Sequence, residues 1–171
     1  MIALMEKILS PLSFVNARMI KILGWITVLI LAFLTANVML GVITRYVFGS
    51  QAGFTDELAR MLLIWISFFG GALGFGKKAH IGLTLLTEKM EPQSRRVCEI
   101  TAILISLIFI AGVWVVGGIM FLQTSIGSAN KLATMPLMWW HVYICIPISG
   151  VFSAFFLTQH MLERIISKGD A

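Results

Sequence analysis

Three charged residues stand at the start of a long apolar run, in the segment FTDELARMLLIW that begins at Phe54. Arg60 follows Asp56 by four positions and Glu57 by three, and both spacings bring side chains together on a helix. A charged side chain at the centre of a membrane helix costs about 2.5–3.5 kcal/mol on insertion scales. The pattern therefore predicts either a cluster that neutralises itself at a helix start, or a pair between one of these charges and Arg45 or another chain.

The segment that ends at Arg45, before this cluster, favours a pair between Arg45 and one of the three charges. Asn37, Gly41, Thr44 and Arg45 lie on one side of a helix, so polar groups of two neighbouring helices would converge at the same end. Polar groups within a membrane are functional candidates by default. No ionisable residue lies near the middle of any apolar segment, so we do not expect a proton relay or a coupled-ion site in this chain.

Histidines and cysteines are the remaining residues that could hold a metal or a cofactor. Cys98 and Cys145 stand far apart without CxxC spacing, so we expect no disulfide and no metal site. Of His80, His141 and His160, the first and last are expected near one membrane boundary and outside the spans, where haem ligation is conceivable but water or lipid is the commoner partner. No nucleophile–base pair or phosphate loop is recognisable, so we expect neither an enzyme nor a bound cofactor.

The composition predicts an integral membrane protein. Apolar residues make up 58% of the 171 positions and charged residues 12%, and the mean hydropathy is +0.94. Soluble domains carry about 25% charged residues, so this chain could not cover a water-facing surface. We expect a single membrane domain over residues 1–171.

The hydropathy pattern predicts four spans, since about 20 mostly apolar residues cross a hydrocarbon core of about 30 Å. Helices are expected, because a spanning segment must satisfy its own backbone hydrogen bonds. The fold is therefore an all-α, four-helix domain whose sequence neighbours run antiparallel. The predicted spans cover residues 21–46, 55–75, 97–124 and 137–165.

Prolines and one connection add local expectations. Pro11 is expected to bend or interrupt the stretch before the first span, and Pro147 to kink the fourth span. The connection between spans two and three mixes apolar and basic residues in GKKAHIGLTLLTEKMEPQSRR. We expect a short element there that lies at the membrane surface.

Lysine and arginine predict the orientation. Ten of them fall in the N-terminal stretch, the connection between spans two and three, and the tail, whereas Arg45, Arg60 and Lys131 fall at the opposite side. By the positive-inside rule, both termini face the cytoplasm. The excess of basic residues that gives the net charge of +5 is explained by membrane orientation, so no nucleic-acid partner is expected.

One face of the second span carries small residues as well as the charges, while the opposite face is bulky. Close approach of helices in lipid depends on such residues, because burial from water does not drive association there. The segment GGALGFG contains the GxxxG spacing that lets backbones meet. The predicted packing face consists of Ser67, Gly70, Gly71 and Gly74.

The fourth span begins with the aromatic segment MPLMWWHVYICIP. Trp139, Trp140 and Tyr143 are residue types that a water–lipid boundary favours, because each ring is apolar with one polar tip. We expect them to anchor the helix at the boundary. A docking surface for an external partner is the alternative.

The segment RYVFGSQAGFTDELARMLLIWISFFGGALGFGKKAHIGL, residues 45–83, resembles the small membrane subunit of tripartite ATP-independent periplasmic (TRAP) transporters. The likeness rests on an Arg–Tyr/Gln–hydrophobic–Phe start, an aromatic before an acidic pair, and a span with a Gly-Ala-rich end that basic residues and then His80 with Ile81 follow. The segment PLMWWHVYICIPISG is similar to that family's fourth-span entrance. The family's usual acidic residue after the His–Ile pair is absent here, and no role is assigned to His80.

The resemblance implies a helper subunit in the bacterial inner membrane. In that family a large permease subunit holds the substrate and sodium sites, and a periplasmic binding protein delivers an organic acid such as sialic acid or a C4-dicarboxylate. The small subunit braces the large one and possesses no substrate site of its own. We therefore expect Arg45, Asp56, Glu57 and Arg60 to organise one end of the helices and the subunit contact.

Two other functions fit four spans. One is a haem- or quinone-binding anchor of a respiratory enzyme, and the other is a small multidrug exporter. Such exporters depend on a glutamate embedded in the membrane, whereas Glu57 lies close to the boundary.

Overall fold

The computed structural model describes residues 2–50, 53–77, 92–128 and 131–166, without the side chains at 2–11, 92–93, 96 and 164–166. This part of the chain is helical almost throughout, as predicted. Its elements are α1 (Ile2–Phe48), α2 (Gly53–Gly76), α4 (Pro92–Phe109), the π-helix η1 (Ile110–Gly117), α5 (Gly118–Gly127), α6 (Trp139–Tyr143) and α7 (Cys145–Ile166).

Four segments among the described residues are long and apolar enough to cross a membrane, which confirms the predicted number of spans. They are Leu12–Phe48, Gly53–Gly76, Val97–Gly127 and Trp139–Glu163. The third span consists of α4, η1 and α5, and the fourth of α6 and α7. The predicted surface element between spans two and three lies outside the described residues.

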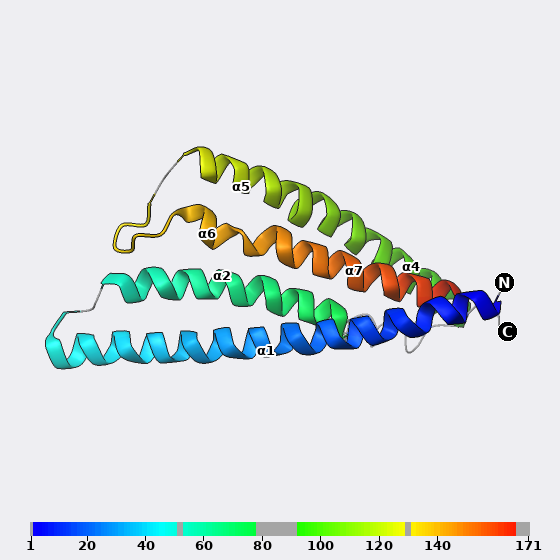
Figure 1. Cartoon of the computed structure of the whole chain (residues 1–171), viewed down its shortest axis with the longest axis horizontal. Coiled ribbons are helices and arrows are strands. Elements are labelled where there is room, and N and C mark those ends of the chain that lie inside the picture. Colours follow the sequence, from blue (N-terminus) through cyan, green and yellow to red (C-terminus); the bar gives the residue numbers. More distant parts are fainter. Residues whose placement is uncertain (1, 51–52, 78–91, 129–130, 167–171) are drawn as a thin grey trace.

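The helices form a fan (Figure 1). Helix α2 packs between α1 and α7, and α7 packs in turn against α4 and η1. The beginning of α1 and the end of α7 lie where the helices converge, and α1 is joined to α2, and α5 to α6, at the opposite, splayed end. We call this splayed end the hairpin end. The up-and-down order follows the prediction of antiparallel neighbours.

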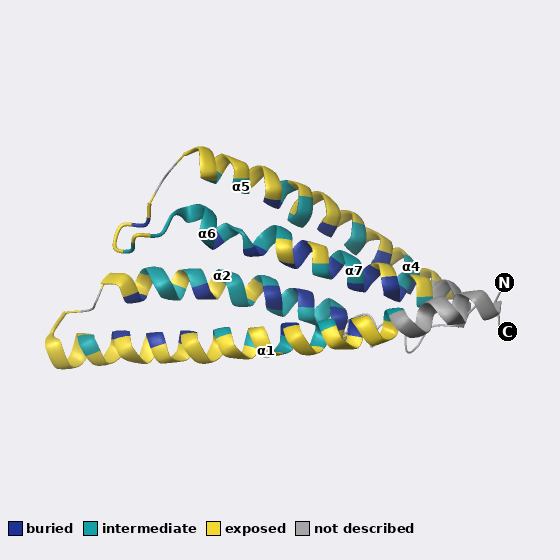
Figure 2. Cartoon of the chain, viewed as in Figure 1, coloured by how far each residue is buried: buried dark blue, intermediate teal, exposed yellow. Residues whose placement is uncertain are grey.

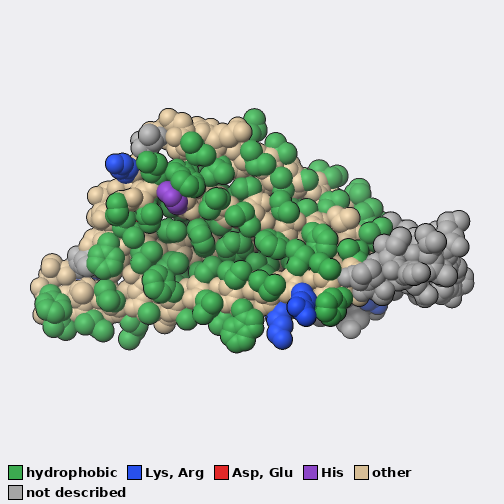
Figure 3. All heavy atoms as spheres, in the orientation of Figure 1, with side chains coloured by type: hydrophobic (Ala, Val, Ile, Leu, Met, Phe, Trp, Pro, Cys, Tyr) green, Lys and Arg blue, Asp and Glu red, His purple; other side chains and the backbone are tan. Residues whose placement is uncertain are grey.

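Helix α1 forms one edge of the fan and is exposed along most of its length (Figure 2). Its buried residues include Leu23, Leu34 and Asn37. Together with half-buried residues such as Thr27 and Ile30 they recur every three or four positions, which is the spacing of a two-helix seam. Large apolar side chains cover its other faces, and the visible face of the whole molecule is mostly hydrophobic (Figure 3). Lipid is the medium that such a surface requires.

The prediction that Pro11 interrupts the first helix is wrong, because α1 runs unbroken from Ile2 to Phe48. A proline removes one backbone donor and strains one turn, and the long helix on its C-terminal side accommodates this cost. The helical rise from Lys21 to Arg45 is about 36 Å at 1.5 Å per residue. That length slightly exceeds a hydrocarbon core of about 30 Å, so these two basic residues bracket the span.

Two groups of buried apolar residues join the helices. The first links α1, α2 and α7 through Leu23, Phe69, Ala72, Cys145 and Phe156. The second links α4, η1 and α7 through Ile103, Ile110 and Leu157. The bulky face predicted for α2 is thus turned into the bundle, where Leu62 and Phe69 are each 7% exposed.

The π-helix η1 in the third span was not predicted from the sequence. Its wider turn directs Trp114 against Phe68 and Phe75 of α2, with ring centroids 5.0 and 6.2 Å away. A Cβ atom at Gly150 of α7 would meet the Trp114 Cβ at 3.0 Å. Helices η1 and α7 therefore approach each other at the distance that only glycine allows.

The fourth span is interrupted at Ile144, between α6 and α7. Pro147 lies one turn later, and its ring excludes the helical hydrogen bond to the Tyr143 carbonyl. The disruption predicted at this proline is therefore present. The Trp65 Nε1–H of α2 donates to the Val142 carbonyl at 3.0 Å, which ties α2 to this junction.

Candidate functional site at the hairpin end

Glu57 joins α2 to the connection between α5 and α6. Its two carboxylate oxygens accept hydrogen bonds from the Ala133 amide at 2.8 Å and the Thr134 amide at 2.9 Å. The Thr134 hydroxyl donates a further short bond. The sequence indicated Arg45, Arg60 or another chain as partners for the cluster and missed this loop, which lies more than seventy residues further along.

The α5–α6 loop that Glu57 binds has a defined shape. Lys131 and Met138 form an isolated antiparallel bridge, and the Leu132 amide donates to the Leu137 carbonyl at 2.8 Å. Leu132 itself is only 6% exposed. It lines a small pocket of about 40 Å³ that is shared with Glu57, Arg60 and other residues of α2 and α6. The loop is thus held by an apolar side chain and by a carboxylate.

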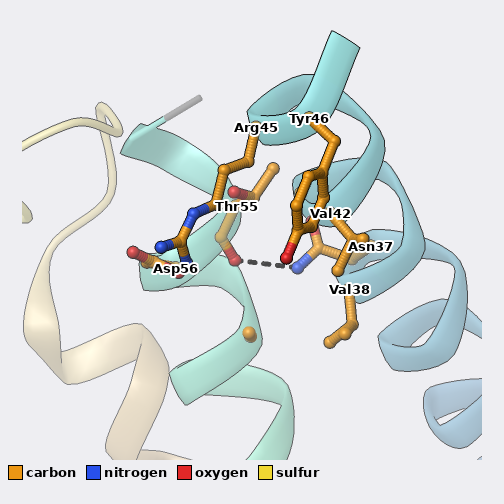
Figure 4. Close-up of a pocket in the computed structure, with 9 residues that line it drawn as sticks. Asn37, Val38, Val42, Arg45, Tyr46, Thr55 and Asp56 are labelled. Carbon is orange, nitrogen blue, oxygen red and sulfur yellow. Dashed lines mark hydrogen bonds between the residues drawn. The ribbon is translucent and has the colours of Figure 1, made fainter. Parts of the chain in front are cut away.

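Asp56 faces the other way, toward α1. Figure 4 shows the Arg45 side chain extending toward the Asp56 carboxylate across a groove between α1 and α2. Beside them, the Asn37 Nδ2–H donates to the Thr55 carbonyl at 2.8 Å in a buried position. The convergence of polar groups that the sequence predicted for the two helices is therefore present, with Asp56 and not Glu57 opposite Arg45.

The groove has a volume of about 210 Å³. In Figure 4, Arg45 and Tyr46 lie at its upper part. The other lining residues are Asn37, Val38, Gly41, Val42, Thr55, Asp56 and Ala59. It combines one cation at the last turn of α1 and one anion at the first turn of α2 with polar and apolar side chains.

The small-residue face of α2 is turned away from α1 and α7. Ser67 is exposed and donates its hydroxyl to the Leu63 carbonyl at 2.7 Å. A Cβ atom at Gly70 or Gly74 would meet nothing within 4 Å, whereas one at Gly71 would meet Trp114 at 3.1 Å. Of the predicted packing face, Gly71 is therefore used within the chain.

Arg60 is exposed on the same outward face as Ser67. It also lines the small pocket beside Glu57. The four charged residues are thus brought to one end of the bundle, but they face three directions: the groove, the loop and the outward face of α2.

The aromatic residues at the start of the fourth span form a packed group. The ring of Trp139 stacks on Tyr143 at a centroid distance of 5.9 Å, and Tyr143 meets Phe121 of α5 edge-on at 4.6 Å. Trp140 stacks on His141 at 3.6 Å. Trp139, Trp140 and Tyr143 are half-buried, and Tyr143 joins α6 to α5 through its contact with Phe121.

The expectation that His160 stands outside the spans is wrong. It lies in α7, within the fourth span, and is 5% exposed. His80 lies outside the described residues. Within the described parts of the chain, no three His, Cys, Asp or Glu side chains are grouped to hold a metal ion.

The family of the chain follows from sequence comparison. Residues 34–166 match the family model of the DctQ component of tripartite ATP-independent periplasmic transporters. The match covers all four spans except the beginning of the first, as well as the hairpin-end site. The chain belongs to the DctQ family, the small permease subunits of TRAP transporters.

Known relatives agree. A Haemophilus influenzae protein named as a TRAP transporter small permease protein is 32% identical over 99 residues, 56% of this chain and 62% of that protein. The sialic acid TRAP transporter small permease protein SiaQ of Vibrio cholerae is 25% identical over 142 residues, 83% of this chain and 78% of that protein. The chain thus spans less than two thirds of the first relative.

Proposed function

We propose that this chain braces the large permease subunit of a TRAP transporter during sodium-coupled uptake of an organic acid that a periplasmic binding protein delivers. The main support for the proposal is which face of α2 points into the bundle and which face points outward. Its bulky face points into the bundle, where Leu62 and Phe69 are buried. Its outward face holds Arg60, Ser67, Gly70 and Gly74.

This arrangement is the reverse of what lipid alone would favour. Lipid-facing helix surfaces are bulky and apolar, whereas small residues and polar groups are found where helices meet other helices. A second membrane protein that covers this face would bring helices into close contact at the glycines. It would also remove the exposed arginine from contact with hydrocarbon, where a charge is costly.

The substrate and sodium sites are assigned to the large subunit. Charged side chains in the described spans lie near the span ends and not at the middle, whereas an ionisable group at the middle would have been a candidate for ion coupling. The name of the Vibrio cholerae relative mentions sialic acid. Sialic acids and C4-dicarboxylates are the proposed solute classes, because both carry the carboxylate expected of TRAP substrates.

The basic residues support an orientation with both termini in the cytoplasm of a bacterial inner membrane. The hairpin end then faces the periplasm, together with the loop that Glu57 holds. In that orientation Lys131 and the rims of Trp139 and Trp140 would be accessible to the binding protein, and we propose a direct contact there.

Substitutions on the outward face of α2 test the bracing function. Gly70→Leu and Gly74→Leu should leave this chain folded, because no atom of the chain lies within 4 Å of the new Cβ. We expect both variants to reduce co-purification of the large permease and sodium-dependent uptake in proteoliposomes. Gly24→Leu on α1 is the matched control, since its Cβ also meets nothing within 4 Å. Full assembly and uptake with both α2 variants would contradict the proposal.

A further inference from the structure

Two cations between two aromatic residues form a stripe along α1, near the end where the helices converge. Phe14, Arg18, Lys21 and Trp25 follow one another at spacings of four, three and four residues, which places them on one face of a helix. Phe14 and Trp25 are each 63% exposed, and both cations are exposed as well. We call these four residues the basic stripe.

The basic stripe faces away from the bundle. Leu23, at the same level of α1, shares a buried core with Phe69 of α2 and Phe156 of α7. It stands two residues from both Lys21 and Trp25, which is about 200° around a helix and therefore the opposite side. Figure 3 shows basic side chains protruding from the edge that α1 forms, and no acidic side chain is visible among the described atoms of that face.

The two cations have no partner of opposite charge among the described residues. Residues 12–48 of α1 contain no Asp or Glu, and the ion pair in the described part of the chain joins Arg95 to Glu99. The Arg18 Cζ lies 5.1 Å from the centre of the Phe14 ring, a cation–π contact that holds the guanidinium but uses none of its N–H donors. Two neighbouring like charges are thus left for an anionic ligand.

The basic stripe lies at the depth of lipid headgroups. Lys21 stands at the beginning of the span that Arg45 ends, and Trp25 lies about 6 Å further along the helix at 1.5 Å per residue. An indole at this position marks the boundary between headgroups and acyl chains. Beyond it the same face continues with apolar side chains such as Val28, which is 55% exposed. Cations, an amphipathic ring and an apolar surface follow one another in the order of phosphate, glycerol and acyl chain in a phospholipid.

From these features we propose that the basic stripe binds an anionic phospholipid with two phosphate groups, of the cardiolipin type. One phosphate lies at Arg18 and the other at Lys21, which are about 4.5 Å apart along the helix axis. Trp25 packs on the glycerol and on the first part of an acyl chain. A lipid with one phosphate leaves one of the two cations uncompensated, which is the reason for the preference. The proposal is independent of the bracing function.

Lipid retention tests the site. The chain, alone and in complex with the large permease, is placed in nanodiscs of an ethanolamine phospholipid with cardiolipin and, for equal total charge, twice as much phosphatidylglycerol. It is then extracted gently and examined by native mass spectrometry. Relative to the amounts supplied, we expect cardiolipin to be retained about fivefold over phosphatidylglycerol, the factor that one further cation contributes near an anionic lipid surface. Equal retention of the two lipids would overturn the proposal.

Removal of each cation measures its contribution. Arg18→Gln and Lys21→Gln should each lower cardiolipin retention about fivefold, and the double variant should lower it further. Lys131→Gln, at an exposed cation of the hairpin end, is the control and should change nothing. Unchanged retention in the double variant would refute the site. Loss of the large permease from the double variant while cardiolipin stays bound would assign the basic stripe to a protein partner, and would refute the site as well.

A last variant keeps the net charge but moves one cation. Arg18→Gln combined with Val15→Arg restores the charge at an exposed position, since Val15 is 46% exposed. The new arginine is six residues from Lys21, which is about 120° around the helix, so the two cations no longer share one face. We expect cardiolipin retention to stay as low as in Arg18→Gln alone. Retention equal to that of the unaltered chain would show that net charge is sufficient, and would contradict the two-phosphate site.

Discussion

Gly150 provides the sharpest test of how the third and fourth spans pack. A Cβ at this position would meet the Trp114 Cβ and the Val115 Cγ2 at 3.0 Å, and the Trp114 carbonyl carbon at 3.2 Å. Carbon atoms are at optimal separation at about 3.5–4.0 Å, and one of these neighbours is backbone that cannot rotate away. Gly150→Ala must therefore push η1 and α7 apart by several tenths of an ångström.

Overpacking of this kind costs about 1–3 kcal/mol. Gly74→Ala is the matched control, since its Cβ meets nothing within 4 Å and alanine favours a helix over glycine by up to about 1 kcal/mol. The assay is the free energy of unfolding in mixed micelles, titrated with denaturing detergent. Equal stabilities of the two variants would refute the close approach of η1 and α7.

Three further substitutions address single contacts. Glu57→Gln removes the charge that holds the α5–α6 loop, so amide hydrogen exchange at Thr134 should accelerate while exchange in the span helices stays constant. An unchanged exchange rate at Thr134 would contradict the role of Glu57 in holding this loop. Trp65→Phe keeps an aromatic side chain, although a smaller one, and loses the donor to the Val142 carbonyl. It should lower the free energy of unfolding by at least about 0.6 kcal/mol, the average for hydrogen bonds between membrane helices. Asn37→Val should cost a similar amount by the same assay, and a cost near zero would show that the α1–α2 hydrogen bond is dispensable.

The four spans could be predicted from the sequence because insertion depends on the summed hydropathy of each segment. The predicted span 55–75 differs from α2, Gly53–Gly76, by two residues at most. The first helix differs more, since α1 begins at Ile2 and hydropathy does not mark where a helix continues beyond the hydrocarbon. The π-helix η1 has no local signal in IAGVWVVG, because it is set by the packing of Trp114.

The hairpin-end site was predicted in part. Helical periodicity was sufficient to bring Arg45 and the acidic pair to one end, because each position depends on its own helix. Periodicity could not show that Asp56 faces the groove while Glu57 binds the loop. Glu57 reaches Thr134 through the conformation of a loop, and loop geometry does not follow from residue spacing within a helix.

The most direct test of the bracing function is disulfide crosslinking between this chain and the large permease in native membranes. Ser67→Cys places a thiol on the outward face of α2, and Val28→Cys places one on the apolar face of α1, where Val28 is 55% exposed. With single cysteines introduced along the permease helices, we predict a crosslinked pair for Ser67→Cys and none for Val28→Cys. Crosslinks from Val28→Cys alone, or from neither variant in an active complex, would contradict the assignment of α2 as the bracing face.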